Sequence, residues 1–330
     1  MDNRPFRQNG DIDDAVRFVN ARQGDARHRP RNNAAHRGRN ARRRRRRVRV
    51  FPIILLAFVL LIGILLFDSN TRLVTTEYEM HFANLPQEFD GFRIVVLSDI
   101  HAAVFGEDNE RLISMVVDAE PDIIAITGDF IDNYGRLNRE EQLAVAENIV
   151  RNIVPIAPVY YITGNHEWEG GANALIWPLL DILREHDVYV LRNRFTRLYR
   201  GDDMIILAGT DDPNGPADMM TPTELVGRIR EAEPDAFVVM LEHRNYNLEL
   251  YSNLGIELVI SGHAHGGYIR LPFTDGLLGT QRDWFPSYTS GVYSRDDTKM
   301  LVSRGIGNHL LIPRFLNNPE IVVAILRTAH

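Results

Sequence analysis

The stretch Ile94-Val-Val-Leu-Ser-Asp-Ile-His101 joins a short apolar run to a polar turn, and this plan recurs along the chain. Apolar runs of this length, bounded by Gly, Pro, Asp or Ser, are typical of buried strands. They occur at 94–97, 123–126, 159–162, 205–208, 237–241 and 258–260. Helical spacing lies between the early runs, at 109–119, 139–153 and 172–186, and Asp108 and Asn138 are the expected N-caps. The alternation predicts one α/β domain with some parallel strands over residues 85–330.

The chain beyond residue 264 shows little helical spacing. Further apolar runs there predict strands at 266–271, 299–303 and 321–326. The aromatic-rich segment 271–293 lies among them and has two interpretations. It fits a hairpin packed into the core, and it equally fits an exposed apolar lip that admits a lipid-linked substrate.

Side chains that bind metal ions follow five of the predicted strands. Ligands of open α/β sheets bind outside the carboxyl ends of the strands. Glycines at 128, 164 and 262 precede several of these side chains and allow tight turns. We therefore expect seven metal-ligand residues, with His166 beside them, to converge on one crevice. The seven are Asp99, His101, Asp129, Asn165, His243, His263 and His265.

The types of ligand restrict the chemistry. The chain has no cysteine, which excludes disulfides, thiolate zinc sites and iron–sulfur clusters. Mixed imidazole and carboxylate ligands suit Mn, Fe, Zn, Co or Ni. Seven ligand residues are too many for one ordinary ion and suit two ions that share a carboxylate. A pair of ions activates a bridging hydroxide and neutralises phosphoryl charge during in-line displacement, so the pattern predicts hydrolysis at phosphorus.

Five motifs in residues 93–267 resemble those of the calcineurin-like metallophosphoesterases. They are Asp99-x-His101, Gly128-Asp129, Gly164-Asn165-His166-Glu167, His243 and Gly262-His263-Ala264-His265. Two later stretches, 303–307 and 314–321, resemble a bacterial membrane-associated branch that includes UDP-2,3-diacylglucosamine hydrolase and other phosphodiesterases. The resemblance implies an α/β fold, a four-layer αββα sandwich, with a di-metal centre.

The resemblance also implies a role for each residue. The first ion is held by Asp99, His101 and His265. The second ion is held by Asn165, His243 and His263. Asp129 bridges the two ions. His166 faces the leaving-group oxygen as general acid, or stabilises the phosphoryl charge, and Glu167 orients an imidazole.

Other positions near the motifs are open to two interpretations. The fourth motif has Asn245 where the family pattern has Pro, and position 167 is Glu in place of the more frequent Asp. Asp211, next to Asp212, follows a predicted strand and either caps a loop or lines the rim of the substrate site. Arg304 either pairs with a substrate phosphate or supports the Gly-rich turn around it.

The N-terminal fifth of the chain differs in composition from the rest. Residues 1–50 hold 16 Arg and 5 acidic residues, so we expect 1–47 to be a disordered arm. Residues 51–67 contain no polar side chain and would span roughly 25 Å as a helix. They predict a transmembrane helix over 48–68, followed by a linker over 69–84. A cleaved signal sequence and a buried soluble helix are the alternatives.

The Arg run 42–47 predicts the orientation of that helix in the membrane. Basic flanks stay on the cytoplasmic side, which leaves the catalytic domain extracytoplasmic on a single-pass protein of the cell membrane. The same run could contact anionic lipid. A nucleic-acid partner for the arm is the alternative, and we do not expect one.

These features together predict a membrane-anchored metal-dependent phosphohydrolase. We expect a phosphodiesterase or pyrophosphatase that uses two divalent ions, such as manganese, on a phosphorylated and lipid-linked substrate. Two functions from other classes remain as alternatives. One is a non-catalytic binding protein that keeps the metal site, and the other is nucleic-acid binding through the Arg-rich arm.

Overall fold

The computed structural model describes residues 34–132, 137–169, 174–216, 219–272, 274–280, 282–308 and 312–329, with side chains from residue 50 onward. The chain forms two units, Met1–Ala57 and Phe58–His330. Helix α1 (Ala34–Thr71) begins in the first unit and ends in the second. Residues 34–47 are therefore helical rather than disordered, because Ala and Arg are good helix formers that extend an existing helix. The rest of the expected arm, 1–33, lies outside the described residues.

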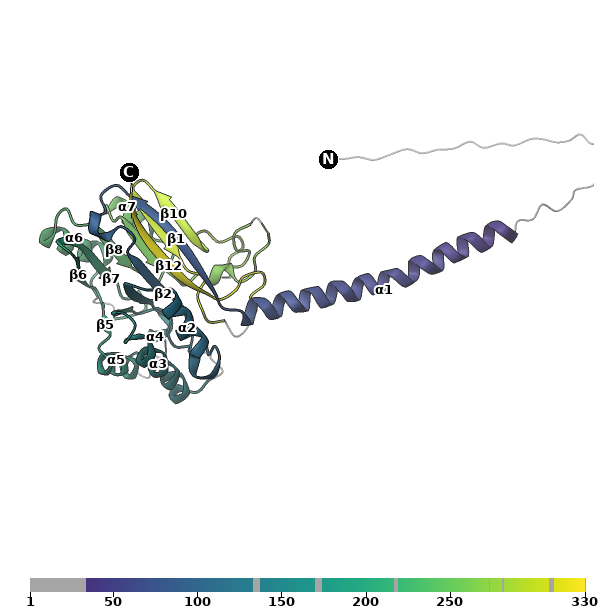
Figure 1. Cartoon of the computed structure of the whole chain (residues 1–330), viewed down its shortest axis with the longest axis horizontal. Coiled ribbons are helices and arrows are strands. Elements are labelled where there is room, and N and C mark those ends of the chain that lie inside the picture. Colours follow the sequence, from purple (N-terminus) through teal and green to yellow (C-terminus); the bar gives the residue numbers. More distant parts are fainter. Residues whose placement is uncertain are drawn as a thin grey trace, which may run out of the picture. The chain divides into compact units, whose positions relative to one another are not determined.

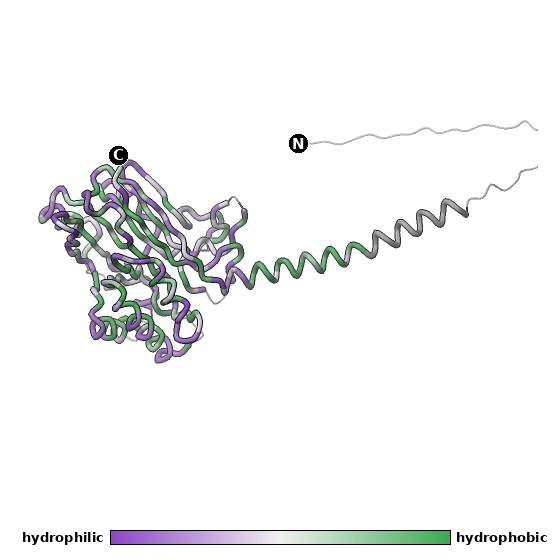
Figure 2. Tube along the Cα trace, viewed as in Figure 1, coloured by the Kyte–Doolittle hydropathy of each residue, from purple (hydrophilic) through white to green (hydrophobic). Residues whose placement is uncertain are grey.

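The apolar part of α1 is a candidate membrane span. It covers the 22 residues Val50–Thr71, and an 18-residue window within them has a mean hydropathy of 3.2 and holds no buried residue. Figure 2 shows the continuous apolar character of this part of the helix. Length, composition and exposure therefore agree with the transmembrane segment expected from the sequence.

Two six-stranded sheets form the centre of the second unit. The first sheet has the order β1 (Val74–Phe82), β12 (Glu320–Thr328), β2 (Arg93–Leu97), β3 (Ile123–Thr127), β4 (Val159–Ile162) and β5 (Tyr189–Val190). The second has the order β10 (Gly291–Arg295), β11 (Thr298–Val302), β9 (Leu258–Ser261), β8 (Val238–Leu241), β7 (Asp203–Gly209) and β6 (Arg194–Arg200). Neighbouring strands are parallel except at β12–β2, β10–β11 and β6–β7.

Helices cover the outer face of each sheet. α2 (Glu110–Asp118), α3 (Arg139–Ile153) and α5 (Ile176–Glu185) pack on the first sheet, and α6 (Pro222–Ala232) and α7 (Leu248–Asn253) pack on the second. Alternate residues of β2 show why the sheets are buried on both faces. Val95 and Leu97 contact the helix layer, whereas Ile94 and Val96 pack between the sheets. This is the four-layer αββα sandwich expected from the sequence (Figure 1).

The six buried strands and helix 139–153 lie where the sequence predicts them, and Asn138 caps that helix through a capping box. The predictions for 69–84 and 266–271 are wrong. The expected linker contains β1, which pairs in parallel with β12 and alternates exposed side chains with partly or fully buried ones. The expected strand is a tight turn at His265–Gly267, because Gly266 and Gly267 take left-handed backbone angles. Asp108 has a φ of 49° and is not the N-cap, because α2 begins at Glu110 and Asn109 occupies the N-cap position.

Candidate metal centre

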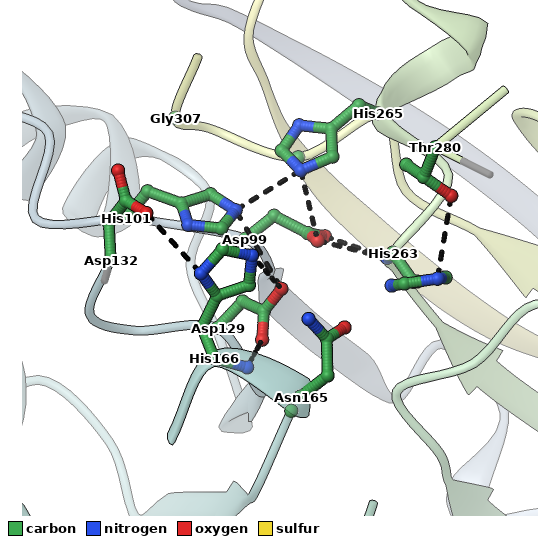
Figure 3. Close-up of polar contacts among 12 residues, drawn as sticks. Asp99, His101, Asp129, Asp132, Asn165, His166, His263, His265, Thr280 and Gly307 are labelled. Atoms are coloured by element: carbon green, nitrogen blue, oxygen red, sulfur yellow. Dashed lines mark hydrogen bonds and ion pairs between the residues drawn. The ribbon is translucent and has the colours of Figure 1, made fainter. Parts of the chain in front are cut away.

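The carboxyl ends of β2, β3, β4, β8 and β9 meet at one place, although these strands come from different sheets. The seven predicted ligand residues and His166 all follow these strands and face one another there (Figure 3). Five of the seven have a left-handed backbone, with φ between 47° and 64°: Asp99, His101, Asp129, His263 and His265. Non-glycine residues adopt such angles at a cost, and those that persist cluster at functional sites.

The first cluster joins Asp99, His101 and His265, whose ligand atoms lie within 4.8 Å of one another. The Nε2 atoms of the two histidines are 3.1 Å apart, and His265 Nε2 is 3.5 Å from Asp99 Oδ1. Imidazole nitrogens that converge on a buried carboxylate match the coordination of a transition-metal ion. These are the three residues that the sequence assigns to the first ion.

The second cluster joins Asp129, His243 and His263. His243 Nε2 lies 3.2 Å from His263 Nδ1 and 3.2 Å from Asp129 Oδ2. Asn165 Oδ1 is 3.1 Å from the same His243 nitrogen, and His243 Nδ1 is 2.9 Å from the carbonyl oxygen of Thr127. That backbone contact holds a proton on Nδ1, so Nε2 is the nitrogen of His243 that can bind a cation.

Asp129 lies between the two clusters. Its Oδ2 atom is 3.2 Å from His243 Nε2 and 3.7 Å from His101 Nε2, so one carboxylate oxygen faces both groups. The side chain is almost fully buried. A carboxylate in this position can bridge two cations, as the sequence expects.

Two glycines allow the loops to approach so closely. A Cβ atom at Gly262 would collide with the side chains of Ser98 and Asp99. A Cβ atom at Gly164 would collide with Asp129. Glycine is therefore required at both turns for the ligand residues to meet.

Burial sets the protonation of the imidazoles. It lowers the pKa of His101 to about 4 and holds the pKa values of His263 and His265 well below the ordinary value. Burial alone would raise the pKa of Asp129, but the adjacent histidines, first His243, hold it well below its usual range. Burial lowers the pKa of His243 as well, but the charge and the hydrogen bond of Asp129 outweigh it and raise that pKa to about 10, so this imidazole would release a proton when a cation binds. Imidazoles together with an ionised carboxylate are the ligands that transition-metal ions prefer, so the residues fit two divalent ions.

His166 is placed beside the ligand residues and has a partner that the sequence analysis missed. Its Nδ1 lies 3.3 Å from Asp132 Oδ1, and its Nε2 lies 3.9 Å from Asp129 Oδ2. Burial lowers the pKa of His166, but the contact with Asp132 and the charges of Asp129 and Glu169 outweigh it and raise the pKa to about 9. The signal for Asp132 was in the sequence, since it follows Asp129 in Gly-Asp-Phe-Ile-Asp.

We expected Glu167 to orient an imidazole, but its carboxylate has other partners. Its carboxylate accepts hydrogen bonds from the backbone N–H groups of Asp129, Phe130 and Gly164, at 3.0, 2.7 and 2.5 Å. Glu167 therefore fixes the loop that carries Asp129, and Asp132 is the carboxylate beside the His166 ring.

Asp211 and Arg304, the candidates for the substrate rim, are engaged within the fold. The Asp211 carboxylate accepts hydrogen bonds from Arg192 and from Thr163, both at 2.9 Å. Arg304 donates to the fully buried Glu320 at 2.5 Å, and Glu320 also accepts from Thr76 at 2.8 Å. These contacts favour the structural interpretation of both residues.

Arg314 is a second residue whose role the sequence did not reveal. It is fully buried, and its Nη2 lies 3.3 Å from Nδ1 of the ligand residue His265. The same nitrogen donates to the carbonyl oxygens of Gly307 and Arg304 at 2.6 and 2.7 Å. Arg314 therefore positions the turn behind the first cluster.

Clusters of His and Asp that could bind metal, at the carboxyl ends of strands from two mixed sheets, indicate a metal-dependent phosphoesterase, and comparison with known proteins agrees. The family model for calcineurin-like phosphoesterases matches residues 92–267. The metallophosphoesterase YkuE of Bacillus subtilis, named as uncharacterized, is 30% identical over 259 residues, which are 78% of this chain and 86% of YkuE. The chain therefore belongs to the calcineurin-like phosphoesterase family.

Two other proteins are similar to parts of this chain. A "transmembrane protein with metallophosphoesterase domain" of Danio rerio is 26% identical over 293 residues, covering 85% of this chain and 63% of that protein. The crystal structure of a dimetal phosphatase from Danio rerio aligns with a TM-score of 0.39 at 11% identity, over 66% of this chain and 88% of that one.

Proposed function

We propose that this chain is a membrane-anchored phosphodiesterase or pyrophosphatase that uses two divalent cations. The observation that carries the proposal is the position of Asp129, whose Oδ2 atom faces His101 of one cluster and His243 of the other. Mn, Fe, Zn and Co all suit these ligands. When bound, such cations would activate a water nucleophile and neutralise charge on the phosphoryl oxygens.

His166 is the residue that would move a proton. Its ring stands next to the ligand residues, its side chain is only 12% exposed, and its Nδ1 faces Asp132. With Nδ1 held in this way, the protonated Nε2 can donate to the oxygen of the leaving group. The backbone N–H of His166 donates to Asp129 Oδ1 at 2.9 Å, which keeps the ring at a fixed distance from the bridging carboxylate.

A cavity of about 420 Å³ supports the proposal of a lipid-linked substrate. Its lining includes His101 and Asp132 as well as Asn70 and Thr71, which belong to the last turn of α1. That turn follows directly on the apolar run 51–67. A headgroup in this cavity would therefore have its reacting phosphorus near the metal centre and its lipid tail near the membrane surface.

The proposed topology places residues 1–49 in the cytoplasm and the catalytic domain on the opposite side of the cell membrane. The Arg run 42–47 supports this orientation through the positive-inside bias. A relative named as a transmembrane protein supports the anchor. Fusing either a green fluorescent protein or alkaline phosphatase to the C-terminus tests this orientation. If the C-terminus is outside the cytoplasm, the phosphatase fusion should be active and the fluorescent fusion should be dark.

Hydrolysis of bis(4-nitrophenyl) phosphate by the full chain in detergent tests the chemistry. We expect activity that EDTA abolishes and Mn²⁺ restores. His166→Ala should lower the rate by about 10² or more while the bound metal is retained, because general acid catalysis contributes on that scale. Asp129→Asn should lose both metal and activity. His186→Ala is the matched control, since His186 lies at the end of α5, away from the site.

Two results would count against the proposal. A wild-type rate for His166→Ala would remove that residue from the mechanism. A metal-loaded wild-type chain without activity on diesters, pyrophosphates or monoesters would favour the non-catalytic binding protein.

A further inference from the structure

Two adjacent aromatic side chains stand out on the surface of the second unit. Trp284 is 71% exposed and Phe285 is 74% exposed. Both belong to a loop whose described residues, 277–280 and 282–288, we call the aromatic loop. Single exposed apolar residues are common on protein surfaces, but two neighbouring bulky aromatics in water are not.

The fold holds this pair outward. Leu278 and Trp284 form an antiparallel bridge, and Gly279 N–H donates to the carbonyl oxygen of Asp283 at 2.9 Å. Phe285 has a φ of 56°, a left-handed angle that a bulky residue adopts only when its surroundings impose it. The exposure of the pair therefore results from a defined loop geometry.

A series of backbone contacts connects the aromatic loop to the end of α1. Phe285 N–H donates to Leu277, Leu277 N–H to Ile269, and Ile269 bridges Phe315, with donor–acceptor distances of 3.0 and 2.8 Å for the two hydrogen bonds. Neighbouring hydrogen-bonded segments lie about 5 Å apart, so these three steps from Phe285 to Phe315 span roughly 15 Å. Arg314, next to Phe315, is hydrogen-bonded to Asn70 in the last turn of α1.

We propose that Trp284 and Phe285 insert into the interfacial region of the bilayer that α1 crosses. The headgroup layer begins at the end of the span and is roughly 5–8 Å thick, so a loop that is joined to the end of α1 through Phe315 and Arg314 can reach it. Tryptophan favours this region because its ring is apolar and its N–H can still bind water or headgroups. The inference rests on the membrane anchor of the proposed function and is independent of the hydrolytic activity.

The base of the aromatic loop lies at the metal centre. Thr280 Oγ1 is 3.4 Å from Nε2 of the ligand residue His263, on the side of the ring opposite the second cluster (Figure 3). At the other end of the loop, Asn245 Nδ2 donates to the carbonyl oxygen of Tyr288 at 2.8 Å. Asn245 is the residue that replaces the expected Pro after His243. Insertion of the loop tip would thus hold the metal centre at the membrane surface.

Quenching of tryptophan fluorescence by brominated lipid tests the proposal. The full chain is placed in nanodiscs of phosphatidylcholine with and without bromine on the acyl chains near the glycerol. We expect Trp284→Phe to reduce the quenching by about twofold or more, because bromine quenches only indoles at the interface, where Trp284 would lie. Trp177→Phe is the matched control, since Trp177 is 51% exposed on α5 and should leave the quenching unchanged.

Equal quenching in wild type and Trp284→Phe would overturn the proposal. Free access of acrylamide to Trp284 in nanodiscs would also overturn it, and would favour a protein as the partner of Trp284 and Phe285. The quenching measurement needs no substrate turnover. A chain that hydrolyses nothing but shows Trp284-dependent quenching would therefore contradict only the proposed activity. Circular dichroism of each variant verifies folding, and the Phe replacement keeps an aromatic ring in the loop.

Discussion

Asn70 and Arg314 bind each other through a reciprocal pair of hydrogen bonds. Asn70 Nδ2 donates to the carbonyl oxygen of Arg314 at 2.8 Å, and the Arg314 backbone N–H donates to Asn70 Oδ1 at 3.0 Å. The guanidinium of Arg314 then reaches His265 of the first cluster. Arg314 therefore contacts both the last turn of the candidate membrane helix and His265 of the first cluster.

Replacement of Asn70 by Ala should weaken both the fold and the first metal site. The change leaves two partly buried backbone groups of Arg314 without partners, which costs about 1–3 kcal/mol of the free energy of unfolding. Thermal unfolding of the full chain in detergent and titration of the metal-free chain with Mn²⁺ measure the two effects. Thr71→Ala is the control, because its hydroxyl bonds only within α1. Unchanged stability and Mn²⁺ affinity would show that the pair does not support the site.

Asp132→Asn should lower the rate and move its pH dependence. Asp132 helps to raise the pKa of His166 to about 9 in the metal-free chain, and bound cations will lower that value. His166 acts in its protonated form, so activity falls as the pH rises through its pKa. The amide removes a raising interaction, so the alkaline limb of the rate profile should move to lower pH. Rates on bis(4-nitrophenyl) phosphate from pH 6 to 10 measure this. A lower rate with an unmoved limb would make Asp132 merely structural.

Removal of metal should destabilise the folded chain. Ions that bind only the native state stabilise it by mass action, by about 2.7 kcal/mol at a concentration one hundred times Kd. We therefore expect EDTA to lower the Tm of the wild type and of His166→Ala by similar amounts. Asp129→Asn should show almost no change on EDTA treatment, because it lacks the shared ligand. Differential scanning calorimetry measures all three, and a large EDTA effect in Asp129→Asn would contradict the bridging position.

Much of this architecture could be predicted from short patterns. Each buried strand is a continuous apolar run, and each ligand residue closely follows such a run. A few neighbouring residues were therefore enough to predict both the strands and the ligand residues. β1 was missed because Val74–Phe82 is an alternating strand with charged residues on its exposed face, which resembles a polar linker. Its pairing with β12 joins residues more than 240 positions apart, a contact that no local pattern reveals.

The supporting residues were harder to predict than the ligands. Asp132 and Glu167 are both carboxylates near His166, and only the three-dimensional path of the loop decides which one faces its ring. The role of Arg314 depends on carbonyl oxygens of a distant turn. Residue type and spacing thus predicted the metal chemistry, whereas the roles of the surrounding side chains depended on backbone geometry.

The pair formed by Arg304 and Glu320 provides the last prediction, because it separates substrate binding from stability. Glu320 is fully buried and accepts from both the backbone and the guanidinium of Arg304. Removing one partner of such a pair costs about 3–5 kcal/mol, so Arg304→Met should markedly lower the free energy of unfolding. Its KM for bis(4-nitrophenyl) phosphate should stay near that of the wild type.

Arg295→Met is the matched control, since Arg295 pairs with Glu249 on the exposed surface and such pairs contribute about 1 kcal/mol or less. Adding Glu320→Gln to Arg304→Met should recover part of the lost stability, because the buried carboxylate is then no longer charged and unpaired. Denaturant unfolding and steady-state kinetics of the same four proteins decide the matter. A raised KM at unchanged stability would instead place Arg304 on the substrate phosphate.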